Sequence, residues 1–130
     1  MKAAARERVD KAEADYAAAR LLRRSRKKYS RDVVCFHLQQ CVEKYLKARL
    51  EEGAVAFPRT HDLERLLDLA VTMEPLWVVF RPVMATLTDY AVEVRYPGRT
   101  VSAPQARKLM LAAAKVRERI RESLGLPRSP

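Results

Sequence analysis

The stretch that decides the fold of this chain runs from Val34 to Arg49 and reads VCFHLQQCVEKYLKAR. On a helix with about 3.6 residues per turn, its apolar residues form one broad stripe. The stripe contains Val34, Leu38, Cys41, Tyr45 and Ala48, and it is widened by Cys35, Val42 and Leu46. A face as wide as this predicts a helix at the centre of a bundle.

A second stripe on the same stretch is mostly polar. Phe36, Gln40, Glu43 and Lys47 follow one another at spacings of four, three and four residues. Polar groups beside a buried face usually have hydrogen-bonding partners. Gln40, Glu43, Lys44 and Lys47 therefore form either a recognition surface or a charge ladder, in which Glu43 and Lys47 stabilise the helix by about 0.3 kcal/mol.

The length and composition predict an all-α protein with a single up-and-down bundle of about five helices. A chain of 130 residues is long enough for one domain, and with only three glycines it is rich in helix-forming residues. We expect one domain over residues 1–130, with a core of about 2–123 and a frayed tail at 125–130. The expected helices cover 2 to about 28, 31–52, 61 to about 73, 75–94 and 103–124.

Capping residues and prolines predict where these helices begin and end. The expected signals are Ser30 before the central helix and Gly53 after it, Thr60 before the third helix, and a capping box of Ser102 and Gln105 before the last. Pro82 falls inside the fourth helix and predicts a kink or a split there. Leu76 and Val79 are expected to face the core on that helix, while Arg117 is expected outside on the last one.

The chain is strongly basic, with a formal net charge of +10. A field of this sign attracts anions such as nucleotides, RNA, DNA or an acidic partner. Part of the excess is concentrated in Arg20, Arg23, Arg24, Arg26, Lys27, Lys28 and Arg31. This run is either a solvated helix end or a patch that contacts phosphates.

The two cysteines indicate a reducing compartment. Cys35 and Cys41 lie on one predicted helix, about 9 Å apart along its axis, and point in different directions, so they cannot bridge each other. Free, buried thiols are typical of a cytoplasmic protein. The first ten residues carry charges where a signal peptide is apolar, and no apolar run is long enough for a membrane span, so we expect a cytoplasmic protein.

Three further groups are candidates for chemistry. His61 with Asp62 can supply a proton acceptor or a phosphate ligand, or can simply begin a helix. Arg95 and Tyr96 stand at a helix break, where they can bind a phosphate and stack on a base, or only end the helix. His37 and Cys41 have metal-ligand spacing, but the other ligands of a zinc site are missing, so we expect no metal and no cofactor.

Taken together, three motifs resemble the HEPN domain, named for higher eukaryotes and prokaryotes nucleotide-binding. They are FHLQQCVEKYLKA at 36–48, THDL at 60–63, and a helix that ends in Arg95-Tyr96-Pro97. The resemblance, to the small stand-alone prokaryotic type, implies a bundle of about five helices, commonly a homodimer. It also implies a toxin–antitoxin-like context, in which the gene often stands beside that of a small nucleotidyltransferase.

Many HEPN relatives are ribonucleases with an Arg-x4–6-His motif in the later part of the bundle, and this chain departs from that pattern. No histidine follows Arg95, and the only pair with the right spacing, Arg31 and His37, stands at the start of the central helix. We therefore expect a non-catalytic module that binds a nucleotide, a nucleotidyltransferase partner or both. The expected binding residues are Gln40, Glu43, Lys47, His61, Arg95 and Tyr96. The alternatives are a metal-independent ribonuclease that uses Arg31 and His37, and a purely structural dimerisation module.

Overall fold

The computed structural model describes residues 1–25, 27–93 and 100–128. Within these residues it contains five α-helices and one 3-10 helix, and no strand. The elements are α1 (Ala3–Arg23), α2 (Lys28–Glu52), α3 (Leu63–Val71), the 3-10 helix η1 (Pro75–Phe80), α4 (Arg81–Glu93) and α5 (Ala103–Ser123). The predicted all-α bundle is confirmed, and no helix in the described residues combines the length and apolarity needed to cross a bilayer.

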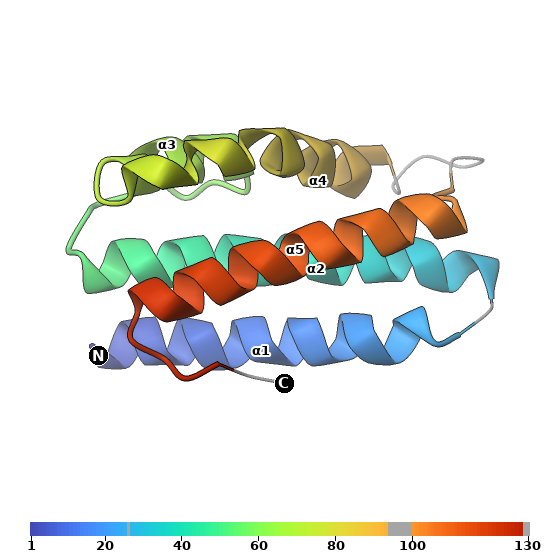
Figure 1. Ribbon diagram of the computed structural model, residues 1–130, viewed down its shortest axis with the longest axis horizontal. Helices are drawn as coiled ribbons and strands as arrows, with labels where there is room; N and C mark the ends of the chain where they lie inside the picture. The colour runs from blue at the N-terminus through green and yellow to red at the C-terminus, as the bar shows by residue number, and fades with distance from the viewer. Residues whose placement is uncertain (26, 94–99, 129–130) are drawn as a thin grey trace.

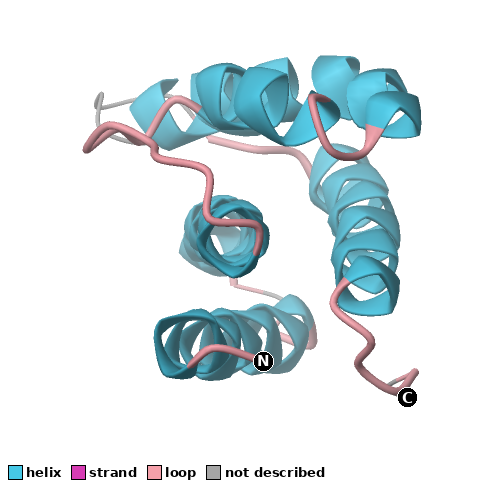
Figure 2. Ribbon diagram, turned by 90° about the vertical axis from the view of Figure 1, so that its left-hand side faces the viewer, coloured by secondary structure: helices cyan, strands magenta, loops and turns pink. Residues whose placement is uncertain are grey.

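Helix α2 is the centre of the bundle, as its broad apolar face predicted. It packs against α1, α3, α4 and α5, and all eight residues of its predicted apolar stripe are buried. In Figure 1, α1 runs antiparallel to α2 on one side, while α3, η1 and α4 form a layer on the other. Figure 2 shows that α5 stands apart from α1, with both helices packed on α2.

The junction between α1 and α2 differs from the expectation. Helix α1 ends at Arg23, and α2 already begins at Lys28, so the prediction of Ser30 as the N-cap was wrong. Ser30 is buried inside the first turn of α2, where its hydroxyl donates a hydrogen bond of 3.1 Å to Ser25 Oγ. The serine therefore binds the segment that joins the two helices instead of capping one of them.

The start of α3 is capped by Asp62, and the prediction of Thr60 as the cap was wrong. Asp62 Oδ1 accepts hydrogen bonds from the backbone N–H groups of Glu64, at 3.0 Å, and Arg65, at 3.3 Å. Thr60 Oγ1 accepts instead from the N–H of Asp62, at 3.1 Å. His61 therefore lies just before the helix and not in its first turn.

The predicted interruption at Pro82 is confirmed, because η1 ends at Phe80 and α4 begins at Arg81, with Pro82 in its first turn. The prediction that Leu76 and Val79 face the core was wrong, since they are 83% and 70% exposed. The 3-10 helix has about three residues per turn, so the buried position falls on Trp77 instead.

The capping box of Ser102 and Gln105 is present at the start of α5, and Gly53 stands at the end of α2, as predicted. Leu109, Ala113, Val116 and Ile120 are buried in the expected register. Arg117 is also buried, although it was predicted to lie outside.

Candidate functional site

Four of the six predicted binding residues belong to one cluster around the buried carboxylate of Glu43. Glu43 Oε1 is 2.9 Å from His61 Nδ1 and accepts a hydrogen bond of 3.2 Å from Gln39 Nε2. Glu43 Oε2 is 3.2 Å from Lys47 Nζ. Gln40 joins the cluster through a hydrogen bond of 2.8 Å to Gln39 Oε1.

This Glu43 cluster ties α2 to the segment that precedes α3. Gln39 Nε2 also donates to the backbone carbonyl of His61, at 3.4 Å, so the segment is held by both its main chain and its side chain. Because Glu43 and Lys47 neutralise each other, the cluster offers little net charge to an anion. His61, whose side chain is 81% exposed, is its most accessible member.

The pair Arg31 and His37 does not converge on one point. Six residues on a helix correspond to about 120° of rotation and about 9 Å of rise, which separates the two side chains. His37 faces α1, where its Nδ1 lies 2.9 Å from Asp15 Oδ1, and Asp15 Oδ2 accepts a bond of 2.5 Å from Lys44. Arg31 instead lines a cavity with Arg23 and Arg107.

The remaining two predicted residues, Arg95 and Tyr96, lie outside the described residues. Within the described part of the chain no cluster of three metal-ligating side chains occurs. Cys35 and Cys41 are free and buried, and burial, reinforced by Asp32, raises the pKa of Cys35 to about 12. These thiols therefore pack in the core and are poor nucleophiles.

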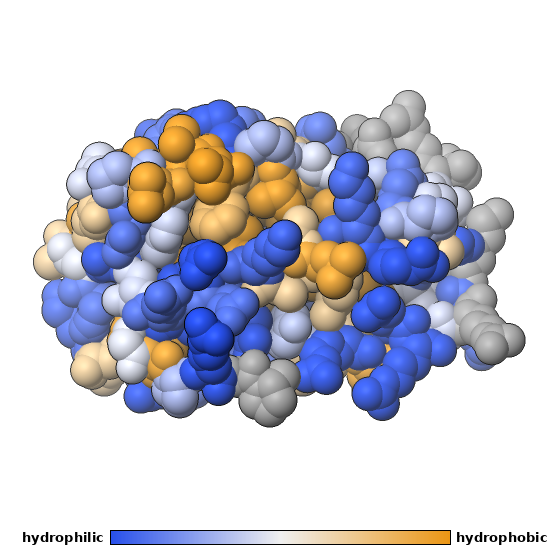
Figure 3. Space-filling model, viewed as in Figure 1, coloured by the Kyte–Doolittle hydropathy of each residue, from blue (hydrophilic) through white to orange (hydrophobic). Residues whose placement is uncertain are grey.

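A different feature, a groove between α1 and α5, is lined by eight arginines. Three cavities follow one another along it, with volumes of about 400, 490 and 380 Å³. The first and second share Arg23, and the second and third share Tyr16 and Ala114. The arginines that line the groove are Arg20, Arg23, Arg24, Arg31, Arg107, Arg117, Arg121 and Arg128. In Figure 3, hydrophilic residues dominate the lower half of this face, over α1 and α5.

The first two cavities of this arginine groove carry positive charge without a compensating carboxylate. No described residue that lines either of them is acidic. Arg23, Arg24 and Arg107 are exposed and Arg31 is half-buried, and none of the four forms an ion pair within the described part of the chain. Side chains from α1, α2 and α5 thus present guanidinium groups to one space.

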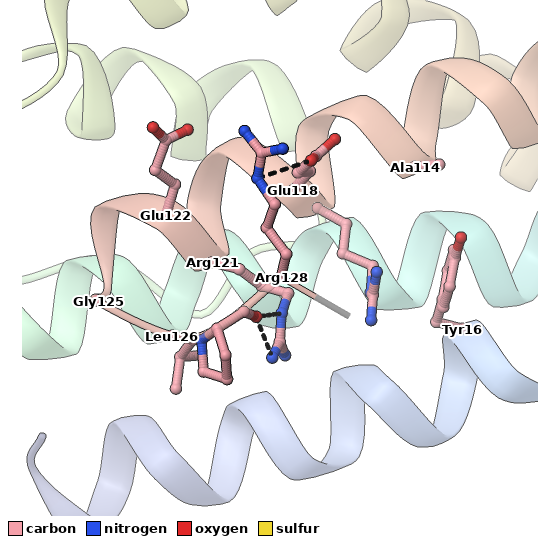
Figure 4. A pocket seen from close by; sticks show the side chains of 10 residues that line it. Tyr16, Ala114, Glu118, Arg121, Glu122, Gly125, Leu126 and Arg128 are labelled. Carbon is pink, nitrogen blue, oxygen red and sulfur yellow. Dashed lines mark hydrogen bonds and ion pairs between the residues drawn. The ribbon is translucent and has the colours of Figure 1, made fainter. Parts of the chain in front are cut away.

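The third cavity is different, because its arginines already have partners (Figure 4). Arg117 binds Glu13 of α1 through two hydrogen bonds of 2.6 Å, and its guanidinium carbon lies 4.1 Å from the centre of the Tyr16 ring. Arg121 donates from Nε, at 3.3 Å, and from Nη2, at 3.0 Å, to the carbonyl of Pro127. Burial acts to raise the pKa of Glu13, but hydrogen bonds from Arg117 and Tyr45 outweigh it and hold this pKa below its ordinary value.

The sequence pattern indicates the arginines of one half of this groove but not those of the other half. The run from Arg20 to Arg31 indicated a possible phosphate patch, whereas the basic residues of the last helix were assigned to solvent. The missing information was that α1 and α5 both pack on α2 in such a way that Arg23 and Arg107 line one cavity. A pattern within one helix does not reveal which helix lies next to it.

Residues 5–123 match the family model described as HEPN domain. The match covers nearly the whole chain. The chain belongs to the HEPN domain family. No curated protein and no solved structure shows significant similarity to it. Within this HEPN domain, the central helix carries the Glu43 cluster, and the arginine groove lies on the side of α2 that faces α1 and α5.

Proposed function

We propose that this HEPN domain binds the phosphate groups of a nucleotide in the arginine groove and does not cleave its ligand. The observation that carries the proposal is the set of arginines from three helices around the first two cavities, with no carboxylate among the described lining residues. A guanidinium group presents a planar fork that binds two phosphate oxygens at once. Several such groups around one space are suited to a ligand with more than one phosphate.

The groove also has an apolar part that is suited to the base of a nucleotide. Tyr16, Met110 and Leu111 line the middle cavity beside the arginines, so a ligand there meets both guanidinium groups and an apolar surface. Nucleotides carry both features, an anionic chain and a flat base. The overall charge of +10 adds a long-range attraction for such a ligand.

The absence of catalysis is proposed from the placement of Arg31 and His37. Hydrolysis of RNA without a metal needs a base near the 2′-hydroxyl and a cation at the same phosphate. Arg31 lines the groove, while His37 is engaged with Asp15 at the flank between α1 and α2. A phosphate in the groove would therefore contact Arg31 but not His37, so the cation and the base would not act on the same phosphate.

Calorimetric titration with ATP, GTP and AMP at 150 mM salt tests the proposal. We expect the triphosphates to bind more tightly than AMP, and the double variant R23A/R107A to lose at least tenfold in affinity. The double variant R59A/R65A removes the same charge outside the groove and is the matched control. Binding that is lost equally in both variants, or absent in the native protein, would contradict the proposal.

The ribonuclease alternative predicts a different result. Incubation of the protein with a labelled RNA in EDTA should leave the RNA intact if the domain only binds. Cleavage by the native protein that disappears in H37A or R31A would replace the binding proposal with the catalytic one.

A second candidate function is docking of a protein partner on the exposed face of α2. Val33 and Phe36 are 39% and 44% exposed there, next to Gln40 and the Glu43 cluster. We propose this face for a second copy or for the small nucleotidyltransferase implied by the toxin–antitoxin-like context, in a cytoplasmic setting. Light scattering of the native protein and of F36E tests the first case, and co-purification with the product of a neighbouring transferase gene tests the second. Loss of either complex in F36E is the expected result, and a complex unaffected by F36E would exclude this face.

A further inference from the structure

We infer that the groove between α4 and α5, together with the exposed side of η1, is a docking site for an acidic amphipathic helix of a partner protein. The groove is a cavity of about 390 Å³. Its lining includes Val83, Thr86 and Tyr90 of α4 and Lys108, Leu109 and Ala112 of α5. We call this surface the α4–α5 face, and its use for docking does not depend on phosphate binding in the arginine groove.

Helix α5 runs antiparallel to η1 and α4 along this face. At the end of α5, Ser123 Oγ donates a hydrogen bond of 2.6 Å to Glu74 Oε1, directly before η1. Toward the start of α5, Lys108 lines the same cavity as Thr86 of α4. Figure 1 shows the same course, so η1 lies beside the C-terminal half of α5 and α4 beside its N-terminal half.

The η1 and α4 side of the face is apolar and largely uncovered. Leu76 and Val79 are 83% and 70% exposed, and residues three apart in a 3-10 helix lie on the same side. The row continues at spacings of four and seven residues with Val83 and Tyr90, which are half-buried in the cavity. In Figure 3, apolar residues gather over the layer of α3, η1 and α4, and hydrophilic residues border them over α5. A contiguous exposed apolar surface of this kind is typical of a site for a partner.

The α5 side of the face is basic. Lys108, Lys115 and Arg119 follow one another at spacings of seven and four residues, so they lie along one side of α5. Lys108 is the only charged residue among the described residues that line the cavity. Lys108 and Lys115 are exposed, and neither forms an ion pair within the described residues. Arg119 forms only an exposed pair with Glu122, at 3.1 Å.

The carboxylates of neighbouring elements leave this basic edge uncompensated. Glu64 and Asp68 of α3 are paired with Arg81 at the start of α4. Glu74 accepts the bond from Ser123, and Asp89 of α4 does not line the cavity. Lys108 and Lys115 can therefore bind carboxylates that a partner supplies.

The dimensions of the face fit a helix of about four turns. From residue 105 to residue 119, α5 extends about 21 Å at about 1.5 Å per residue. From Leu76 to Tyr90, η1 and α4 together extend about 23 Å. A partner helix of about 15 residues has the same length, and its apolar side chains at i, i+4, i+7 and i+11 can enter the groove. Acidic residues along one edge of that helix would meet the lysines of α5.

Two other occupants fit this face less well. A second copy that used the same face in a two-fold contact would bring the basic edges of the two copies together, and like charges repel. A flat membrane surface could contact Leu76 and Val79 but would leave the groove between the helices uncovered. A convex, acidic helix satisfies both the apolar groove and its basic edge.

Fluorescence anisotropy at 150 mM salt tests the inference with three labelled peptides. The probe is a helical peptide of about 16 residues with leucines at i, i+4, i+7 and i+11 and glutamates along one edge. The first comparison peptide has lysines in place of the glutamates, and the second has serines in place of the leucines. We expect the native protein to bind the probe at least tenfold more tightly than either comparison peptide.

Charge reversal tests the basic edge. K108E/K115E should bind the acidic probe at least tenfold more weakly than the native protein does, and should bind the lysine peptide more tightly. R59E/R65E makes the same change in net charge away from this face, and should change both affinities by less than about twofold. The gain for the lysine peptide cannot arise from a loss of folding.

Removal of exposed apolar groups tests the η1 side. L76S/V79S should weaken the probe at least tenfold, whereas L21S/L111S, which changes two leucines that are 68% and 60% exposed elsewhere, should change it by less than about twofold. Far-ultraviolet circular dichroism checks that each variant is folded, which is expected because all of these side chains are at least half exposed.

Several outcomes would overturn the inference. The site is refuted if the native protein binds the acidic and the lysine peptides equally, if it binds neither, or if the control variants lose as much affinity as the test variants. A dimer in light scattering that L76S/V79S dissociates would assign the face to a second copy. Flotation with phosphatidylcholine–phosphatidylserine vesicles that L76S/V79S abolishes would assign it to a membrane.

Discussion

Arg117 of α5 donates two hydrogen bonds to Glu13 of α1, from Nε to Oε2 and from Nη2 to Oε1, each 2.6 Å long. Tyr45 of α2 donates a third bond to Glu13 Oε2, at 2.5 Å. Three helices thus meet at one carboxylate, beside the arginine groove. Since α1 and α5 both pack on α2 and stand apart from each other, this contact helps to set the width of the groove.

Removal of that carboxylate should destabilise the fold. In E13A the guanidinium of Arg117, with a side chain only 6% exposed, stays buried without its partner. Breaking a buried pair from one side costs about 3–5 kcal/mol, and the partial exposure of Glu13 reduces our expectation to about 2 kcal/mol. Urea unfolding measures the loss, and the exposed ion pair of Arg119 and Glu122 supplies the control R119A, expected to change stability by less than about 0.5 kcal/mol. An equal effect of the two variants would contradict the structural role of Glu13.

The same carboxylate should make stability depend on pH. Its pKa lies below the ordinary value of 4.5 in the folded protein, so its contribution is fully present above that value and is lost as pH falls through the folded-state pKa. The difference in the free energy of unfolding between the native protein and E13Q should be constant above about pH 5.5 and should shrink below it. Urea unfolding at pH 7, 5, 4 and 3 measures this difference. A difference that grows on acidification would show the opposite sign of shift.

The two capping candidates before α3 can be separated by mutation. D62A removes the acceptor for two backbone N–H groups and should cost about 1 kcal/mol, whereas T60A removes only a local turn contact and should cost less than about 0.5 kcal/mol. Asp62 is exposed and Thr60 is half-buried, so neither substitution should leave a large cavity in the core. A larger loss in T60A than in D62A would restore the cap that the sequence alone predicted.

The Glu43 cluster should behave as a buried network. E43A leaves Lys47, with a side chain only 12% exposed, without its carboxylate and should cost about 2–3 kcal/mol in the free energy of unfolding. The double variant E43L/K47M replaces both charges by apolar groups and should recover most of that loss. Urea unfolding of E43L, K47M and E43L/K47M beside the native protein completes a double-mutant cycle. Additive effects in this cycle would mean that the two charges do not interact.

Much of the central helix could be predicted from sequence because its signals are local. The stripe from Val34 to Ala48 depends only on helical periodicity, and so does the capping box of Ser102 and Gln105. The convergence of Gln40, Glu43 and Lys47 follows from the same periodicity, and only His61 had to be brought in by the fold. Where the local period changed, as in the 3-10 helix that exposes Leu76, the prediction was wrong.

The arginine groove could not be predicted in the same way. Arg23 and Arg107 are 84 positions apart in the chain, and nothing in either neighbourhood indicates that they line one cavity. Arg117 has neighbours typical of a solvated helix face, yet it is buried because Glu13 and Tyr16 of another helix neutralise and cover it. The burial of Arg117 thus depends on residues of α1, which its own stretch of sequence does not reveal.

By itself, the amino-acid sequence determined that this chain is helical, where its central helix lies and which face of that helix is buried, since periodicity and capping act over a few residues. Only the tertiary structure decided which charged side chains face each other. The packing of both α1 and α5 on α2 arises from contacts over the whole bundle, and this packing brings arginines of separate helices to one groove.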